Sequence, residues 1–333
     1  MLRAPAPEQA TLPDPTPPAA IPVTLLTGFL GAGKTTLLQH VLQHVDPRRI
    51  CIVENEFGAA NIDSEVIETL GPGLVRRLTG CICCAVRTDL VATFQDLAEV
   101  CRAQGVDRVV VETTGMAEPA ELVPLFRANG PLARGFRLAA VVTVADATHV
   151  AVDVENSPVA QSQVAVADLL VLNKRDQVTP EALAAAEGAL RAVNPLARLF
   201  VTAHGACPAE VFLADAPPAV RIELHAPAGH HHGDIAAHLV VDEGPHDLRR
   251  VRAWVRSILK RHGDDFLRTK GFVHARRARR VLLQSVRGHI EMRSFGTFEP
   301  PDPPRTRLVV IGVGLDPSAL DAGLRGCRFP PVQ

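Results

Sequence analysis

Short apolar runs alternate with amphipathic stretches between Val23 and Val201. The apolar runs have strand length and are rich in β-branched residues, whereas the stretches between them have helical spacing. The predicted strands are Val23–Leu26, Ile50–Val53, Val75–Leu78, Arg108–Val111, Arg137–Val144, Leu169–Leu172 and Arg198–Val201, and the predicted helices are Thr35–Val45, Asp89–Gln104, Pro119–Ala128 and Pro180–Val193. This alternation predicts a doubly wound α/β domain whose mostly parallel sheet is covered by helices on both faces.

The pattern changes after Cys207, where Pro, Ala and Gly dominate as far as Gly229–Asp234. Such a composition is typical of an exposed linker. Beyond it, the predicted strands are Ile235–Val241, Phe266–His274, Val281–Val286 and Arg307–Ile311, and the predicted helices are Asp247–Lys260 and Pro317–Leu324. We therefore divide the chain into a leader (1–21), an α/β domain (22–212), a linker (213–234) and a smaller α+β domain (235–331).

Composition narrows the classes of function. The 35 basic and 36 acidic residues leave a net charge of -1, which gives no sign of a nucleic-acid or anionic-membrane binder. The longest apolar runs have strand length and fall short of the roughly 20 residues of a membrane helix. The Pro-rich leader lacks the features of a signal peptide, so we expect it to be disordered and the protein to be cytoplasmic.

A glycine-rich loop follows the first predicted strand and opens a helix. Its glycines allow backbone N–H groups to surround phosphates, Lys34 is placed to reach the β and γ phosphates, and the Thr35 hydroxyl is a ligand for Mg²⁺. The expected phosphate-binding residues are Gly28, Gly31, Ala32, Gly33, Lys34, Thr35 and Thr36. The pattern GxxxxGK[ST] in this context predicts a P-loop that binds a nucleoside triphosphate.

Two further strand ends carry nucleotide chemistry. Asn173, Lys174 and Asp176 follow the strand Leu169–Leu172, and a carboxylate there accepts the N1 and N2 hydrogens of guanine, which adenine lacks. The Asn is expected to contribute hydrogen bonds to the same edge of the base, with Lys174 packed over the ring. The substrate indicated is therefore GTP, and residues 22–212 are predicted to form a P-loop GTPase domain.

Glu112 ends the strand Arg108–Val111, where the acidic residue on the metal side of a P-loop site is expected. Glu112 is predicted to hold Mg²⁺ through water, and the N–H of Gly115 to contact the γ-phosphate. Residues Met116–Pro119 then form a nucleotide-sensitive switch. Asp146, at the end of the next strand, is equally compatible with a plain turn residue.

Three cysteines crowd the end of the third predicted strand. Cys81 and Cys83 are two residues apart, so in extended chain they point the same way and can bind one ion as thiolates, with Cys84 or a nearby carboxylate completing the site. Thiolates favour Zn²⁺ or Co²⁺. Packing or redox chemistry is the alternative, and we expect Cys51 and Cys101 to be ordinary buried residues.

A short histidine run, His230, His231 and His232, lies in the linker. Imidazole is a common transition-metal ligand, so the run is either a collecting arm of low affinity or solvated linker.

These motifs, in this order, resemble those of the CobW-type GTPases, which include cobalt- and zinc-handling metallochaperones and the nitrile hydratase activators. The resemblance extends from Val23 to the C-terminus. It rests on the P-loop GFLGAGKTT, NEFG at Asn55–Gly58, GCICC at Gly80–Cys84, ETTGMAEP at Glu112–Pro119, NKRD at Asn173–Asp176 and LRTKGF at Leu267–Phe272. The resemblance implies Cys81, Cys83 and Cys84 as metal ligands coupled to GTP binding, with Glu54 and Glu56 near the switch.

The resulting hypothesis is a slow GTPase that binds Zn²⁺ or Co²⁺ and delivers the metal to a client metalloprotein. A homo-oligomer is compatible with the sequence. Three alternatives stand beside it: a regulatory GTPase whose cysteines only pack, a small-molecule kinase and a metal-storage protein.

Overall fold

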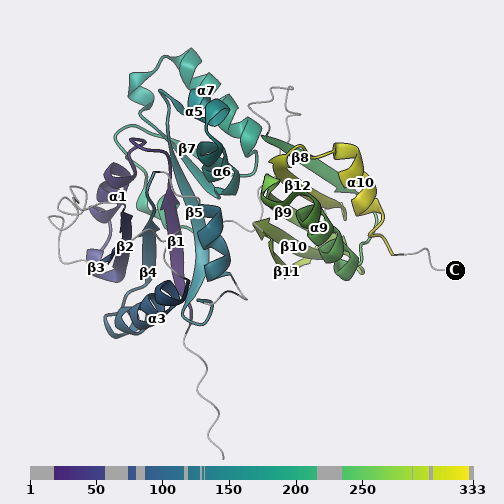
Figure 1. Cartoon of the computed structure of the whole chain (residues 1–333), viewed down its shortest axis with the longest axis horizontal. Coiled ribbons are helices and arrows are strands. Elements are labelled where there is room, and N and C mark those ends of the chain that lie inside the picture. Colours follow the sequence, from purple (N-terminus) through teal and green to yellow (C-terminus); the bar gives the residue numbers. More distant parts are fainter. Residues whose placement is uncertain are drawn as a thin grey trace, which may run out of the picture.

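A seven-stranded parallel sheet forms the centre of the first half of the chain. The computed structural model describes residues 19–56, 74–79, 87–115, 119–127, 130, 132–215, 235–286, 288–299 and 303–329. The strands are β1 (Ile21–Thr27), β2 (Ile50–Glu56), β3 (Leu74–Thr79), β4 (Arg108–Glu112), β5 (Phe136–Asp146), β6 (Leu169–Asn173) and β7 (Arg198–Val201). Their order is β3-β2-β4-β1-β5-β6-β7, and every neighbouring pair is parallel, as predicted (Figure 1).

Helices cover both faces of this sheet. On one face lie α1 (Lys34–Leu42) and α8 (Ala209–Phe212), and on the other lie α3 (Arg87–Ala103), α4 (Pro119–Leu122), α5 (Val150–Asn156), α6 (Pro158–Val166) and α7 (Pro180–Val193). Short 3₁₀ turns occur at η1 (Pro47–Arg49), η2 (Val123–Phe126), η3 (Arg175–Gln177) and η4 (Gly263–Asp265). The helix predicted over Pro119–Ala128 is therefore split into α4 and η2, and α5, α6 and α8 were not predicted.

Local signals explain where these helices begin. α6 and α7 start with the same arrangement, in which a hydroxyl residue precedes a proline at the first helical position. The side chain of Ser157 accepts a hydrogen bond from Ala160 N, and that of Thr179 from Ala182 N. The proline needs no N–H at this position, because the first helical N–H groups have no partner within the helix.

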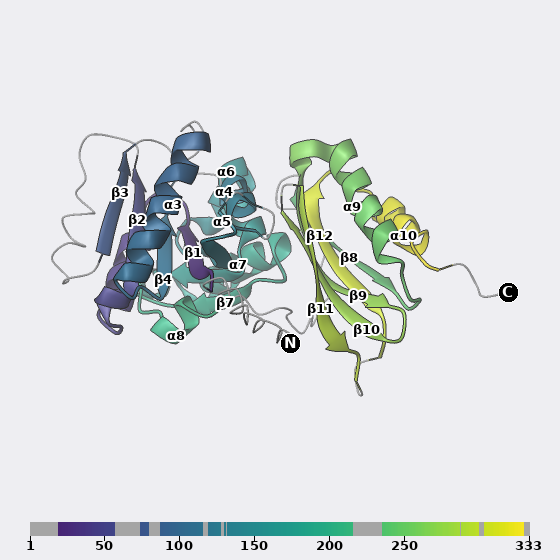
Figure 2. The same ribbon diagram turned by 90° about the horizontal axis from the view of Figure 1, so that it is seen from below.

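An antiparallel sheet forms the C-terminal domain. Its strands are β8 (Ile235–Asp242), β9 (Phe266–Ala275), β10 (Arg279–Val286), β11 (His289–Thr297) and β12 (Thr306–Val313), in the order β11-β10-β9-β12-β8. The amphipathic helix α9 (Leu248–His262) and α10 (Pro317–Arg325) pack on one face, with Trp254 in the core (Figure 2). β11 was not predicted. None of the described helices has the length and apolar character needed to cross a bilayer.

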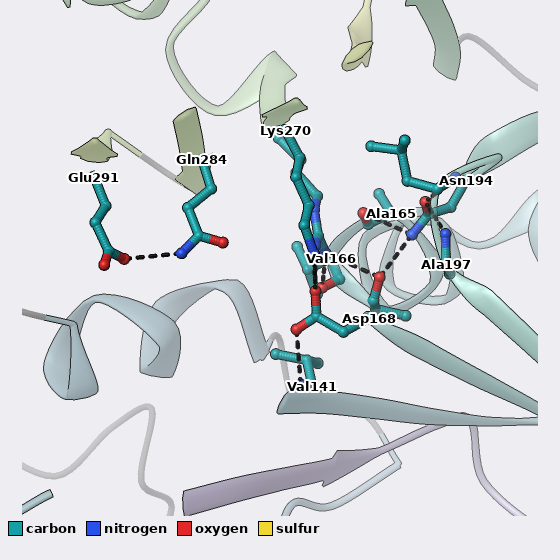
Figure 3. Close-up of polar contacts among 12 residues, drawn as sticks. Val141, Ala165, Val166, Asp168, Asn194, Ala197, Lys270, Gln284 and Glu291 are labelled. Atoms are coloured by element: carbon teal, nitrogen blue, oxygen red, sulfur yellow. Dashed lines mark hydrogen bonds and ion pairs between the residues drawn. The ribbon is translucent and has the colours of Figure 1, made fainter. Parts of the chain in front are cut away.

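The other face of the C-terminal sheet packs against the helical layer of α5, α6 and α7 (Figure 2). Apolar residues of β8, β9 and β12 share one core with these helices. A buried ion cluster lies beside that core: Arg268 and Lys270 of β9 both donate to Asp168, the latter at 3.1 Å, and the other Asp168 oxygen accepts from Val141 N at 3.1 Å (Figure 3).

The cluster keeps Asp168 ionised. Complete burial would raise the pKa of this carboxyl, but the positive charges of Lys270 and Arg268 hold it well below its ordinary value. A carboxylate with a lowered pKa stabilises the fold fully above its unfolded pKa of about 3.9, and the stabilisation is lost as the pH falls through the folded pKa.

We therefore expect Asp168→Asn to lower the free energy of unfolding by about 3–5 kcal/mol at pH 7, because two buried cations lose their counter-charge. The difference in the free energy of unfolding between this variant and the unsubstituted protein should become smaller as the pH is lowered below about 4. Urea unfolding across a pH series measures both effects.

The control is Glu155→Gln, at an exposed position on α5, which should change stability by less than about 0.5 kcal/mol at every pH. A pH-independent deficit in Asp168→Asn would contradict the electrostatic explanation.

Candidate functional site

The predicted P-loop connects β1 to the start of α1 at the carboxyl edge of the parallel sheet. Gly33 adopts a φ of 99°, and a Cβ atom there would meet the Asn173 amide nitrogen at 2.4 Å, so glycine is required for this close approach. The Lys34 ammonium donates to the carbonyls of Gly28 at 2.8 Å and Phe29 at 3.3 Å. The lysine side chain is therefore folded back over its own loop.

The two predicted Mg²⁺ residues lie together. Thr35, in the first turn of α1, donates its hydroxyl hydrogen to Glu112 Oε1 across a distance of 3.4 Å. Glu112 ends β4, the immediate neighbour of β1 in the sheet. A hydroxyl and a carboxylate oxygen are hard ligands of the kind that Mg²⁺ prefers, so these residues fit the ion.

The switch glycine touches the P-loop directly. A Cβ atom on Gly115 would lie 2.7 Å from Leu30 N, so only glycine allows the two loops to approach this closely. Just before it, the buried Thr113 hydroxyl donates to Thr27 Oγ1 at 2.9 Å and fixes the strand end. The backbone carbonyl of Gly115 accepts a hydrogen bond from the side-chain Nε2 of Gln163, on α6, at 3.1 Å. Met116, Ala117 and Glu118 lie outside the described residues.

Asn173 links the phosphate side of the site to the base side. Its Nδ2 donates to Ala32 O in the P-loop at 3.1 Å, and its Oδ1 accepts from Gly205 N at 3.0 Å. Gly205 belongs to the loop after β7, which was not predicted as part of the site. The side chain is buried and its amide holds two loops together, whereas the expected contact with the base edge stays a prediction.

Lys174 and Asp176 emerge beside Asn173. Lys174 has a positive φ of 62°, and its ammonium bonds Asp146 at 2.7 Å. Burial alone would raise the pKa of Asp146, but the hydrogen bonds from Lys174 and Thr148 lower it below its ordinary value. Asp146 therefore positions Lys174. The Asp176 carboxylate is exposed at the same end, with His204 Nε2 3.7 Å away.

The sheet register places the predicted metal segments relative to the P-loop. In the backbone register, Glu54 of β2 is paired with Glu112 of β4, and Glu56 is paired with Thr79, where β3 ends one residue before the cysteine motif. The carboxyl ends of β1 and β3 are three strand spacings apart in this order, or about 14 Å. Strands β2 and β4 lie between β1 and β3, so their carboxyl ends separate the P-loop strand from the strand that leads into the cysteine motif.

The predicted ligands Cys81, Cys83, Cys84, His230, His231 and His232 lie outside the described residues. Within the part of the chain that the structure describes, no group of three His, Cys, Asp or Glu residues is arranged to hold a metal. The expectation that Cys51 and Cys101 are ordinary buried residues is confirmed.

Comparison with known proteins identifies the family. Residues 22–201 match the CobW/HypB/UreG nucleotide-binding domain, and residues 235–328 match the C-terminal domain of the cobalamin synthesis protein CobW. The chain is 31% identical to the zinc chaperone YjiA of Escherichia coli, covering 92% of this chain and 99% of YjiA. It is 32% identical to the zinc chaperone CobW of Pseudomonas aeruginosa, covering 92% of this chain and 91% of that protein.

Solved structures agree with this assignment. The Zn(II)-bound YjiA GTPase from E. coli superposes with a TM-score of 0.70 at 26% identity, covering 93% of this chain and all of YjiA. A partial relative, the zinc-regulated GTPase metalloprotein activator 1 of Schizosaccharomyces pombe, is 33% identical over 56% of this chain and 46% of its own length. The P-loop and the two matched domains therefore identify this chain as a member of the CobW/HypB/UreG family of P-loop GTPases.

Proposed function

We propose that this GTPase is a metallochaperone that binds Zn²⁺ at its cysteine motif and transfers the ion to a client metalloprotein in a GTP-dependent manner. The observation that carries the proposal is the sheet register, which brings the ends of β2 and β3 to the edge that also holds the P-loop and Glu112. The names of the relatives, two of them zinc chaperones, favour Zn²⁺ over Co²⁺ as the cargo. We also propose that the protein acts in the cytoplasm.

The nucleotide site supports GTP hydrolysis to GDP and phosphate. Lys34 exchanges its bonds to the loop carbonyls for the β and γ phosphates, and the Gly115 N–H contacts the γ-phosphate. Thr35 and Glu112 hold Mg²⁺, which supplies charge neutralisation on the phosphate oxygens. We expect slow intrinsic hydrolysis, as in GTPases that lack a built-in arginine finger.

Guanine selection rests on Asp176. Its carboxylate is exposed beside Lys174, which Asp146 holds in place, and it accepts the N1 and N2 hydrogens of the base. Asn173 contributes by keeping the P-loop and the Gly205 loop in register around the nucleotide.

Cys81, Cys83 and Cys84 supply the thiolate ligands, with Glu54 and Glu56 on the neighbouring strand. Because about 14 Å separates the strand ends, Mg·GTP acts on this site by ordering the loops after β2 and β4, and hydrolysis relaxes them. The histidines His230, His231 and His232 form an auxiliary arm that raises the local metal concentration.

Substitutions at Asn173 and Asp176 should distinguish a structural role from a role in guanine recognition. Asn173→Ala leaves the carbonyl of Ala32 and the amide of Gly205 without their partner, so it should cost about 1–3 kcal/mol of stability and weaken GTP and GDP binding together. Asp176→Asn, at an exposed position, should change stability by less than about 0.5 kcal/mol. It should nevertheless lose at least about tenfold in GTP affinity and gain affinity for xanthosine triphosphate, which offers an acceptor where guanine has an amino group.

Thermal unfolding and nucleotide titrations of the two variants check this contrast. An Asn173→Ala protein of normal stability, or an Asp176→Asn protein that still prefers GTP, would show that the roles are assigned wrongly.

Metal binding should depend on both the cysteines and the nucleotide. We expect the non-hydrolysable Mg·GTP-analogue form to bind Zn²⁺ at least about fivefold more tightly than the Mg·GDP form, as measured by chelator competition. The Cys81→Ser/Cys83→Ser protein should lose that gain, whereas the matched Cys51→Ser/Cys101→Ser protein, changed at two buried packing positions, should keep it. Zinc affinity that ignores the nucleotide would favour a regulatory GTPase with structural cysteines.

A further inference from the structure

Helix α6 is buried between the two domains. Every residue from Ala160 to Val166 is buried, although Gln161, Ser162 and Gln163 are polar. The helix packs against α4, α5 and α7 of its own domain and against β9 of the C-terminal domain. The buried part of a helix packed against four other elements shifts only if those elements adjust, because protein interiors are close-packed.

One end of this connection is the nucleotide switch. The side-chain Nε2 of Gln163 donates to Gly115 O at 3.1 Å, and the backbone carbonyl of Gln163 accepts from the Thr143 hydroxyl of β5 at 2.7 Å. The short helix α4, which directly follows the switch residues 116–118, also packs on α6. Gly115 is therefore held from behind by α6 while it lies against the P-loop at Leu30.

The other end is the C-terminal domain. Arg268 donates to the carbonyls of Val166 and Ala167, and it shares Asp168 with Lys270. Asn194 donates to the carbonyls of residues 164, 165 and 167, as Figure 3 shows in part. The last helical carbonyls, which have no partner within a helix, are thus bound in part by an arginine from the other domain.

We propose that Gln163 is a positioning residue for the GTPase switch. In the same proposal, Arg268 at the end of α6 couples the packing of the C-terminal domain against α6 to the nucleotide state. Gln163 and Val166 are three residues apart, so one helical turn of about 5 Å connects the two contacts. Loss of the γ-phosphate moves the Gly115 turn only if the Gln163 bond breaks or α6 shifts, and a shift of α6 strains the bonds to Arg268.

The inference concerns the GTPase alone and does not require metal transfer. It predicts that the docked C-terminal domain favours the GTP-bound switch, and by reciprocity that GTP tightens docking. A client that pulls the C-terminal domain away from α6 would thereby lower the preference for GTP over GDP.

The test uses the full chain without transition metal. Gln163→Met removes the amide donor at similar size, and Arg268→Met removes the guanidinium. We expect each to lose about fivefold or more in the ratio of Mg·GTP-analogue to Mg·GDP affinity and in single-turnover hydrolysis. The double variant should be no worse than the more severe single variant, because both act on one connection.

The matched control is Glu291→Gln, which removes another interdomain ion pair, that between Glu291 and Arg127 at 2.9 Å, without touching α6. In this control, the ratio of Mg·GTP-analogue to Mg·GDP affinity should stay within about twofold of that of the unsubstituted protein. A purely structural role would weaken both nucleotides equally and leave the ratio unchanged. Unchanged ratios in Gln163→Met and Arg268→Met, or an equal loss in Glu291→Gln, would overturn the proposal.

Hydrogen exchange of the unsubstituted protein provides a second measurement that needs no variant. Amides of β9 and α6 should exchange more slowly with the Mg·GTP analogue than with Mg·GDP, because the docked state is favoured. Equal protection of both elements in the two nucleotide states would refute the coupling even if the variants failed to fold.

Discussion

The buried cluster of Asp168, Arg268 and Lys270 is the constraint on which the arrangement of the two domains depends. Ionised groups taken out of water are tolerated only when they are paired and hydrogen-bonded, and Asp168 satisfies this requirement through two cations and a backbone amide. Removing one partner from such a cluster costs several kcal/mol, so a docking arrangement that separated Asp168 from Arg268 and Lys270 would be disfavoured by that amount. The guanidinium of Arg268 extends the same contact to the end of α6.

This arrangement places two separate tasks on one nucleotide site. Towards the edge that ends in β3, strands β4 and β2 lie between β1, which leads into the P-loop, and β3, which leads into the cysteine motif. Behind the switch, Gln163 and α6 connect Gly115 to the C-terminal domain. In the proposed mechanism, the predicted γ-phosphate contact at Gly115 therefore acts in two directions, towards the proposed metal segment and towards the second domain.

The sequence predicts the parts of this protein whose chemistry is local. Strand-length apolar runs gave all seven parallel strands, and the P-loop spacing indicated the nucleotide. Helix α6 was not predicted because the tertiary fold buries the polar residues Gln161, Ser162 and Gln163, so the helix has no amphipathic periodicity. The Ser157–Pro158 start was its one sequence signal for a helix. β11 escaped for the opposite reason, since it is an edge strand with much of its surface exposed.

Roles that depend on distant partners were harder to predict. The amide of Asn173 joins Ala32 to Gly205, a pairing that no spacing in the sequence reveals, and its expected contact with guanine stays a prediction. The choice between a turn and a functional role for Asp146 was open, and the structure shows both a turn contact with Thr148 and a bond to Lys174. The metal ligands lie outside the described residues and stay a prediction from sequence.

The central claim is that nucleotide and metal act on each other across the carboxyl edge of the sheet. The most direct measurement is the affinity of the full chain for a non-hydrolysable Mg·GTP analogue with and without one equivalent of Zn²⁺. Thermodynamic linkage predicts that Zn²⁺ tightens binding of the analogue by the same factor by which the analogue tightens binding of Zn²⁺. Equal affinity for the analogue with and without Zn²⁺ would contradict the account.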